Sequence, residues 1–544
     1  MIPFKKITLS KQYLLQTADD GLELVDFVNL IAQHARIFQP ARLPQVLEQD
    51  LTFSPKKSKF LLVDLNNFAS FPTLAVGILV AALRSRGHNT EVLCPLSYDV
   101  PATQREHQER LIDHIKRRIH LTDWEPALGL RDAFRSLANN FGDRPHPILV
   151  KEVRRALGGQ PDAILISAYL QHFSSVKTIA ELAKDFGVPV ILGGPAFNNA
   201  ATAKVWASLK GVSVVVGAEV DRDLPALAEC VVARGNILNH AGVFLPDGTS
   251  SNAAAPLQNL DAVPIPDFTD FPWNRYPVRI VPVMTGRGCQ WDKCQFCSDV
   301  QSVSGRSFRT RSVENVLLEM QEQARRHETS NFLFLDLKLN SWPGMIRGIA
   351  KGIAGIVRGA EWVGTVHVDE RPDNGLSRSD LEAAVEGGMR RISFGLESGS
   401  QRLLQSMRKG SSVARNSTFI KDAHAAGLSI RCTMFKGYPG ETADDMESTF
   451  RFLEEHAPYI DRVRFNDFSI YPQTPIWHVL NDKTSVGTKV EVVRVDVQRG
   501  RINYRNMEAR SFAYRKAKAS ALAVVYEINR RALRDSARQF DGLM

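Results

Sequence analysis

Cysteine is scarce in this sequence, with six residues in a chain of 544. So few cysteines cannot form a disulfide framework. Long apolar runs are missing too: the longest, residues 74–83, is shorter than the roughly 20 residues that span a bilayer and is typical of a core helix. The N-terminus, MIPFKKITLSKQ, lacks the apolar core of a signal peptide. We therefore expect a cytoplasmic globular protein without a membrane partner.

The net charge of +9 comes from 68 basic and 59 acidic residues and is unevenly distributed. Residues 499–544 carry 11 Lys/Arg against four Asp/Glu. We interpret this surplus as a solvated face of C-terminal helices, with a platform for an acidic, phosphorylated or nucleic-acid substrate as the alternative. We do not expect nucleic acid to be the partner.

The first half of the chain predicts an α/β domain. Residues 1–57 have a helical pattern. Apolar runs that alternate with amphipathic helices then extend over residues 58–239, with a polar helical insertion at 100–155. Buried parallel strands have this apolar character, and the alternation predicts a doubly wound, Rossmann-like sheet. A ligand of such a sheet lies beyond the carboxyl ends of its strands.

The second half predicts another α/β domain. Residues 240–277 are rich in Pro, Ala and Asn and are interpreted as a linker. Six strand–helix units follow within residues 278–480, and residues 481–544 form a basic, helical C-terminal extension. Right-handed crossovers curl six such units into a full or partial TIM-type barrel, with its chemistry at the carboxyl ends of the strands.

Three cysteines fall at one of these strand ends. Cys289, Cys294 and Cys297 follow the first barrel strand in a Cys-x4-Cys-x2-Cys pattern. Thiolates are ligands of iron–sulfur clusters and of zinc. A structural zinc site needs four ligands, whereas three thiolates on a four-iron cluster leave one iron open for a substrate or cofactor. We favour the cluster; a zinc site completed by Asp292 or Asp299, and free core cysteines, remain alternatives.

This loop resembles that of the radical S-adenosylmethionine (SAM) superfamily, whose hallmark is Cys-x3-Cys-x-aromatic-Cys. The first gap here has one extra residue. The resemblance implies a partial (βα)6 barrel and a [4Fe-4S] cluster whose open iron binds SAM. It also implies that Cys289, Cys294 and Cys297 are the ligands and that Phe296 lies beside the SAM adenine.

Further segments resemble a subgroup of this family. Residues 394–400, FGLESGS, resemble a motif in which the glutamate contacts the SAM ribose and the serine lies near the methionyl part, which implies these roles for Glu397 and Ser398. Residues 407–410, MRKG, fit the same subgroup. Asp336, and more weakly Asn340, stand where relatives bind the SAM amino group, although the usual Gly-Gly-Glu is absent.

Two other segments have structural alternatives. Residues 437–442, GYPGET, are interpreted as a turn in which Thr442 caps the next helix, with backbone contact to the SAM adenine as the alternative. His367, Asp369 and Arg371 follow the third barrel strand. They are candidates for substrate binding or for pairing with one another.

A doubly wound domain before such a barrel resembles the cobalamin (B12)-binding class of radical SAM enzymes. The mutase-type Asp-x-His-x-x-Gly motif is absent, because Asp64-Leu-Asn-Asn-Phe follows the first strand. The resemblance implies a cobalamin site at the ends of later strands. Its candidate residues are Ser167, Tyr169, Gly193, Gly194, Gly217 and Glu219.

The resemblance implies reductive cleavage of SAM to a 5′-deoxyadenosyl radical, with electrons from a donor such as flavodoxin or ferredoxin. With methylcobalamin, it implies methylation of an unactivated carbon in a peptide or natural-product intermediate. Three alternatives remain. They are another radical reaction (cyclisation, ring contraction or sulfur insertion), a tRNA methylthiotransferase, and a non-enzymatic cluster- or zinc-stabilised binding protein.

Overall fold

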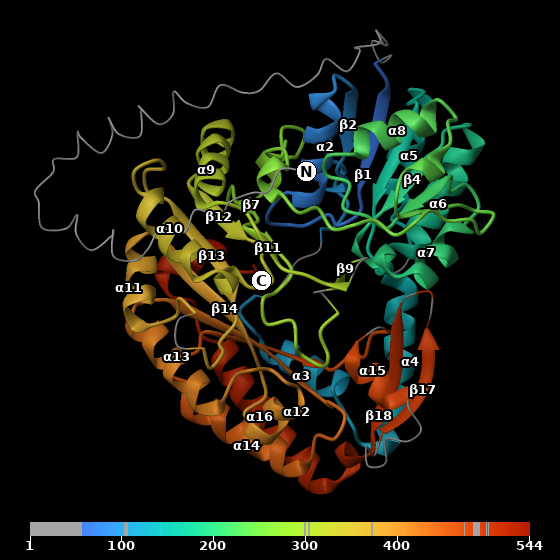
Figure 1. The fold of residues 1–544 in the computed structure, drawn as a ribbon. Coiled ribbons are helices and arrows are strands. Elements are labelled where there is room, and N and C mark those ends of the chain that lie inside the picture. Colours follow the sequence, from blue (N-terminus) through green and yellow to red (C-terminus); the bar gives the residue numbers. More distant parts are fainter. Residues whose placement is uncertain are drawn as a thin grey trace, which may run out of the picture. The chain divides into compact units, whose positions relative to one another are not determined.

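Two six-stranded sheets organise the part of the chain that the structure, a computed structural model, describes (Figure 1). The chain divides into two units, residues 1–56 and 57–544. The described residues all lie in the second unit; they are 57–102, 107–142, 144–298, 301–302, 305–371, 374–472, 474–481, 490–496, 498 and 500–543. The helical pattern predicted for residues 1–57 thus falls, except for Lys57, outside the described residues.

The first sheet has the strand order β2-β1-β3-β4-β5-β6. Its first five strands are parallel, and β1 is buried at five of its six residues, as expected of a strand covered on both faces. The strands are β1 (Lys59–Asp64), β2 (Asn89–Leu93), β3 (Ala163–Ser167), β4 (Val190–Gly193), β5 (Val214–Val216) and β6 (Val243–Phe244). The helices are α2 (Leu74–Ser85), α5 (Pro147–Gly158), α6 (Phe173–Asp185), α7 (Ala200–Ala207) and α8 (Leu224–Val232).

Strand β6 is a departure from the predicted linker. It lies within residues 240–277 and pairs antiparallel with β5, so the sheet is mixed rather than wholly parallel. The pairing gives the backbone of Val215 and Val216 hydrogen-bond partners at what would otherwise be an open sheet edge.

The second sheet is entirely parallel, in the order β16-β15-β14-β13-β12-β7, as predicted for a partial barrel. Its strands are β7 (Val281–Val283), β12 (Asn331–Phe334), β13 (Glu361–Val366), β14 (Met389–Glu397), β15 (Ser429–Lys436) and β16 (Arg462–Asp467). Its helices are α9 (Val313–His327), α10 (Pro343–Ile353), α11 (Arg378–Glu386), α12 (Gln401–Ser406), α13 (Val413–Ala425) and α14 (Ala443–His456). Thr442 caps α14, as predicted, because its hydroxyl accepts a hydrogen bond from the Asp445 amide.

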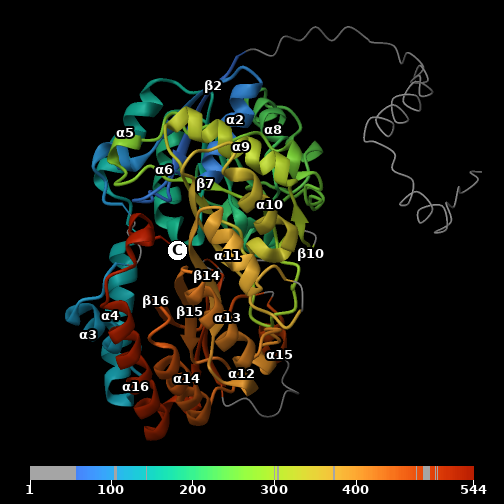
Figure 2. The same ribbon diagram turned by 90° about the vertical axis from the view of Figure 1, so that its left-hand side faces the viewer.

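The predicted insertion and C-terminal extension both pack on the barrel. The insertion forms α3 (Leu111–His120) and α4 (Glu125–Gly142). After α15 (Pro475–Asn481), the C-terminal part forms the antiparallel strands β17 (Val490–Asp496) and β18 (Arg501–Asn506) and then α16 (Phe512–Asn529), which lies beside α14 and α3 (Figure 2). The hairpin was not predicted, although the valines of β17 favour a strand.

Among the described residues, no helix has both the length and the apolar character needed to cross a membrane.

Glu441, in the turn after β15, shows how α16 supports the barrel. Its carboxyl group accepts a hydrogen bond from the Tyr514 hydroxyl (2.7 Å) and another from the Gly437 amide. Burial raises the pKa of Glu441 to about 7 despite these hydrogen bonds. The folded state therefore binds a proton more tightly than the unfolded chain does.

This predicts that ionisation of Glu441 destabilises the fold. Its contribution is fully present at pH values below the pKa of the unfolded chain and is lost as pH rises through about 7. Between pH 5 and pH 8 the free energy of unfolding of the native protein should fall, relative to Glu441→Gln, by on the order of 3 kcal/mol. Urea unfolding at both pH values measures the difference. The exposed Glu455→Gln should track the native protein, and equal slopes for all three proteins would contradict the prediction.

Candidate active site

The three cysteines lie in the loop that follows β7 and the two-residue strand β8 (Gly286–Arg287). All three are partly buried and none forms a disulfide. Among the described residues, no group of three His, Cys, Asp or Glu side chains converges closely enough to hold a single metal ion. A four-iron cluster binds each thiolate to a different iron, so its ligands need not converge on one point. Three partly buried thiols on one loop fit such a cluster.

A buried carboxylate supports the base of this loop. Asp336 accepts hydrogen bonds from the Thr285 amide (3.0 Å), the Thr285 hydroxyl (2.7 Å) and the Gly286 amide (2.8 Å). Burial raises the pKa of Asp336 to about 6 in spite of these bonds. Asn340 is likewise engaged with backbone, at His367 and Asn374. Both residues therefore have structural partners, and contact of either with SAM stays a prediction.

The tip of the loop rests on residues 407–410. The Trp291 indole donates a hydrogen bond to the Arg408 carbonyl (2.8 Å), and the Gln295 amide donates one to the Met407 carbonyl (2.9 Å). The ring of Phe296 packs against Phe435 and Phe468, with centroids 5.4 and 6.1 Å apart. These contacts hold the cysteine-bearing segment against the carboxyl ends of the last barrel strands.

Glu397 and Lys409 form a buried ion pair beside the cysteines. The Lys409 Nζ lies 2.7 Å from Glu397 Oε1 and 5.7 Å from the centroid of the Phe296 ring. Glu397 adopts a left-handed backbone conformation (φ 61°) at a β-bulge in β14, and a side chain at Gly395 would collide with its carboxylate. The bulge thus turns Glu397 towards Lys409.

Electrostatics keep this lysine charged. Burial alone would lower the pKa of Lys409, but the negative charges of Glu397 and of the Cys294 and Cys297 thiolates raise it above its ordinary value. A fixed ammonium group beside thiol ligands attracts anions, including a carboxylate. Sequence reasoning noted residues 407–410 only as a motif, because nothing in the spacing shows that Lys409 folds back onto Glu397.

Ser398 is buried, and its hydroxyl lies 3.0 Å from the Thr449 hydroxyl of α14 and accepts a hydrogen bond from the Ser400 amide. This geometry gives it a role in the turn before α12. Its predicted proximity to SAM stays a prediction.

A second polar group surrounds Asp369, after β13. Lys338 Nζ lies 3.1 Å from Asp369 Oδ2, and Arg371 lies 2.5 Å from the same oxygen. Burial lowers the pKa of the neighbouring His367 well below its ordinary value, and Lys409 and Lys338 lower it further, so the ring is neutral. Its Nε2 atom is buried and has no hydrogen-bond partner in the described structure. The alternative that Asp369 and Arg371 pair with each other is the one observed.

The candidate cobalamin residues occupy the carboxyl ends of β3, β4 and β5. Ser167 pairs in register with Gly193, and Gly193 pairs with Val216. Tyr169, just beyond β3, is 46% exposed. The φ angle of Gly194 is 151°, and a side chain there would collide with the Ala168 carbonyl. A side chain at Gly217 would collide with the Phe197 carbonyl. These two glycines therefore allow close backbone packing, while Gly193 faces more open space.

Glu219 does not stand free at this edge. It pairs with Arg309 at 2.6 Å, and the adjacent Arg287 binds Asp221 in a bidentate manner at 2.7 and 2.8 Å. Arg287 and Arg309 are register partners in the β8–β11 pair, where β11 is Arg309–Thr310. We name these four residues the arginine clasp; it joins the loop after β5 to the cysteine loop. The clasp is not predicted by the sequence pattern, although Arg287 lies only two residues before Cys289.

Known proteins share this arrangement. A model of the radical SAM superfamily matches residues 283–453, which include all three cysteines and the Glu397 segment. The chain belongs to the radical SAM superfamily. It is a radical SAM enzyme, and the family implies a [4Fe-4S] cluster and SAM as its cofactors.

Relatives of this radical SAM enzyme include methyltransferases. It is 27% identical over 327 residues to an uncharacterized methyltransferase of Pyrococcus horikoshii, covering 58% of this chain and 69% of that protein. It is 24% identical over 332 residues to bacteriochlorophyllide d C-12(1)-methyltransferase of Chlorobaculum tepidum, covering 59% and 66%. The fold resembles the radical SAM methyltransferase TsrM of Kitasatospora setae, solved with cobalamin and a [4Fe-4S] cluster, with a TM-score of 0.59 and 14% identity over 87% of this chain and 89% of that one.

The Glu397–Lys409 pair yields a stability prediction. Lys409→Met leaves a buried carboxylate without its partner, which should lower the free energy of unfolding by about 3–5 kcal/mol. The double variant Lys409→Met/Glu397→Gln should recover most of this loss, because no unpaired charge remains. Arg378→Met, in an exposed pair with Glu382, should change stability by less than about 0.5 kcal/mol. Urea unfolding measures all three, and a double variant as unstable as the single one would refute the pairing.

The arginine clasp yields a second prediction, on stability and on iron binding. Arg287→Gln breaks the bidentate contact with Asp221, and we expect it to destabilise the protein by about 3 kcal/mol. It should also lower retention of cluster iron, since Arg287 lies beside Cys289. Arg287→Lys should recover only part of the stability, because an ammonium group cannot bind both carboxylate oxygens as guanidinium does. The matched control is Arg275→Gln, whose partner Asp99 is exposed. If the control loses as much stability and iron as Arg287→Gln, the clasp has no special role.

Proposed function

We propose that this radical SAM enzyme binds cobalamin at the carboxyl edge of its N-terminal sheet and methylates an unactivated carbon of a peptide or natural-product intermediate. When bound, the cluster and SAM supply a hydrogen-abstracting carbon radical, and methylcobalamin supplies the methyl group. The observation that carries this proposal is the arginine clasp, which ties the loop after β5 to the loop of Cys289.

The edge of the N-terminal sheet fits a flat macrocycle. Ser167 and Gly193 end neighbouring strands, and the nearest atom to a side chain placed at Gly193 would be 3.9 Å away. Small residues at such an edge allow a ring to approach the backbone. The Asp64 carboxyl group, where a mutase-type motif would begin, instead accepts hydrogen bonds from Thr73 and the Asn66 amide. The proposal therefore involves no histidine ligand from that loop.

On the barrel side, Lys409 provides a fixed positive charge for the carboxylate of SAM, and Phe296 provides an aromatic surface for its adenine. The neutral His367 offers an unpaired ring nitrogen within the barrel. We propose it as a hydrogen-bonding partner for the substrate. A small one-electron protein such as flavodoxin or ferredoxin would act as the reductant.

The relatives support methyl transfer as the reaction. Two of them are methyltransferases by name, and a methyltransferase of similar fold was solved with cobalamin and a [4Fe-4S] cluster, two of the three proposed cofactors. Because the matches cover only part of each curated relative, the substrate is proposed by class alone.

The test is anaerobic reconstitution with iron, sulfide, SAM, hydroxocobalamin and dithionite. The native protein should bind cobalamin and release 5′-deoxyadenosine. Cys294→Ala should abolish deoxyadenosine formation. It should leave cobalamin binding intact, because Cys294 lies on the cysteine loop and not at the edge of the N-terminal sheet. Cys230→Ala, outside the cysteine loop, should behave like the native protein.

Two outcomes would contradict separate parts of the proposal. Undiminished deoxyadenosine from Cys294→Ala would refute the ligand assignment. SAM cleavage by a native protein that takes up no cobalamin would refute the cobalamin site and, with it, methyl transfer from cobalt.

A further inference from the structure

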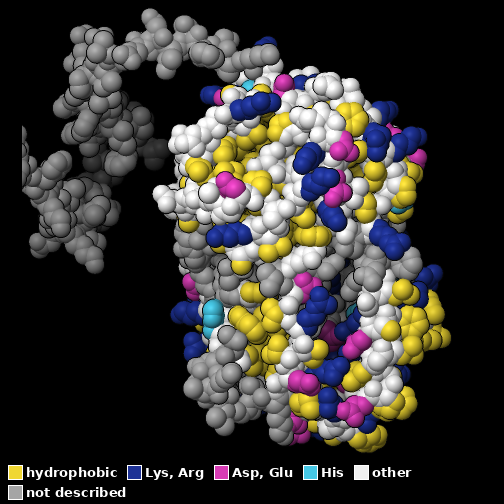
Figure 3. All heavy atoms as spheres, turned by 90° about the vertical axis from the view of Figure 1, so that its right-hand side faces the viewer, with side chains coloured by type: hydrophobic (Ala, Val, Ile, Leu, Met, Phe, Trp, Pro, Cys, Tyr) yellow, Lys and Arg dark blue, Asp and Glu magenta, His cyan; other side chains and the backbone are white. Residues whose placement is uncertain are grey.

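The two insertion helices α3 and α4 turn apolar side chains to the solvent. Leu111, Ile115 and Ile119 of α3 and Leu130, Phe134 and Leu137 of α4 are each between 44% and 61% exposed. Their spacings, i, i+4, i+8 and i, i+4, i+7, place each set on one face of its helix. We name these six residues the insertion face. Hydrophobic side chains gather at the lower right edge of Figure 3, over the position that α3 and α4 have in Figures 1 and 2.

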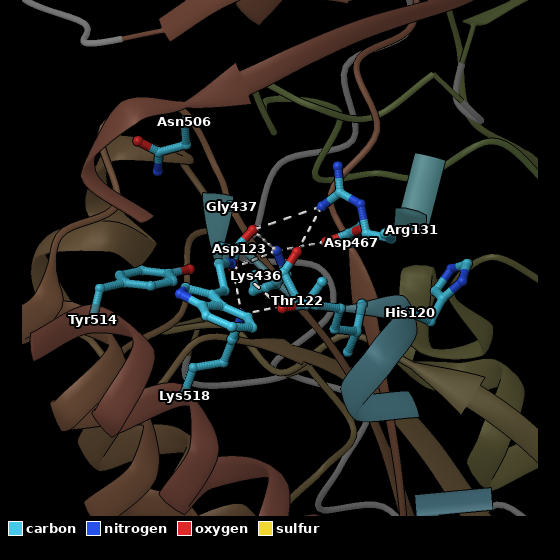
Figure 4. A network of polar contacts seen from close by, with 12 residues as sticks. His120, Thr122, Asp123, Arg131, Lys436, Gly437, Asp467, Asn506, Tyr514 and Lys518 are labelled. Carbon is cyan, nitrogen blue, oxygen red and sulfur yellow. Dashed lines mark hydrogen bonds and ion pairs between the residues drawn. The ribbon is translucent and has the colours of Figure 1, made fainter. Parts of the chain in front are cut away.

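Asp123, between the helices, and Arg131 and Arg135 of α4 point the opposite way, into the protein, whereas Lys116 and Arg118 of α3 are exposed. Asp123, between the helices, binds Lys436 Nζ at 2.7 Å and also binds Lys518 (Figure 4). Arg131 of α4 lies 4.0 Å from Asp123, and Arg135 binds Asp467 at the end of β16. Lys518, a partner of Asp123, has its pKa lowered to about 8, mainly by burial and further by repulsion from the charge of Lys436.

The result is an inverted amphipathic helix. Between Pro126 and Leu137, every fully exposed residue of α4 is uncharged. A surface helix normally buries its apolar stripe and exposes its charges. Because ion pairs of the partly buried Arg131 and Arg135 hold α4 in this orientation, its apolar face is a feature of the fold. Large exposed apolar patches of this kind mark interaction sites.

We propose that a second copy of this chain covers the insertion face. An aromatic side chain offers on the order of 200 Å², and Leu and Ile offer less. With Ile112 and Trp124, which are also about half exposed, the eight side chains present several hundred Å² per copy, which is most of the share of one partner in a standard interface. Two helices with matching apolar stripes form a self-complementary surface that a two-fold axis closes into a four-helix contact.

The charge pattern favours a second copy over a lipid surface. Helices that lie on membranes border their apolar face with Lys and Arg. The exposed face of α4 carries neither, and Arg131 and Arg135 are held by internal carboxylates. The exposed Lys116 and Arg118 lie on α3. Packing α3 of one copy against the exposed face of α4 of the other, which carries no Lys or Arg, keeps the two basic sets apart.

The test is the mass of the full-length protein by sedimentation velocity, from about 1 to about 100 μM. We expect dimers of the native protein. Leu130→Ser/Phe134→Ser should weaken association by a factor on the order of 100 or more, since each substitution counts twice in a symmetric interface. Both side chains are exposed, so its thermal unfolding should match that of the native protein. Phe512→Ser, which changes a residue that is 75% exposed but outside the insertion face, should leave the dimer intact.

Three results would overturn the proposal. The native protein could stay monomeric throughout this concentration range. The double variant could dimerise as tightly as the native protein. Finally, monomers could bind vesicles of phosphatidylcholine and phosphatidylglycerol through the insertion face, with binding lost in the double variant, which would assign this face to lipid.

Discussion

The chemistry of this protein depends on holding a loop with almost no regular structure of its own. The cysteine segment is anchored at its base by the Asp336 carboxylate, at its tip by the backbone of residues 407–410, and at its side by the bidentate pair of Arg287 and Asp221. Two of these anchors come from the barrel and one from the N-terminal sheet. The Asp336 and Arg287–Asp221 anchors are charge-assisted hydrogen bonds with buried or mostly buried partners, which makes them directional and costly to break. The loop is thereby one of the places where the two halves of the chain meet.

The cationic side chains at the site outnumber the carboxylates that pair with them. Lys409 is matched by Glu397, and Lys338 shares Asp369 with Arg371. The excess of cations lies beside three thiols, which become anionic when they bind iron. Burial raises the desolvation cost of each charge, so removing one partner leaves an unfavourable state. This arrangement matches a site that receives an anionic cluster and a carboxylate-bearing cofactor.

Much of the fold could be predicted from the sequence, because it depends on local patterns. The first five strands of the N-terminal sheet and all six barrel strands fall within the two regions, 58–239 and 278–480, for which alternating strands and helices were predicted, and the cap at Thr442 follows from residue type. The cysteine motif sufficed for the family. The antiparallel strand β6 escaped prediction, since its two residues carry no periodic signal and its partner β5 is distant in sequence.

The residues that sequence reasoning missed act through long-range pairing. Lys409, Asp221 and Arg309 acquire their roles only when distant segments fold together. The helices of the insertion were expected, but their orientation was not, because a helical pattern alone does not show which face is buried. Asp336 and Ser398 were singled out for SAM, and both have protein partners in the structure. The expected roles of these two residues, the domain boundaries and the absence of a membrane partner remain predictions.

The central claim is that three cysteines hold a four-iron cluster with one iron left open. Mössbauer spectroscopy of protein reconstituted anaerobically with ⁵⁷Fe, recorded with and without SAM, tests it most directly. We expect a [4Fe-4S] spectrum in which SAM changes the signal of a single iron and leaves the others unaltered. A protein that assembles no such cluster, or one whose iron sites are all indifferent to SAM, would contradict it.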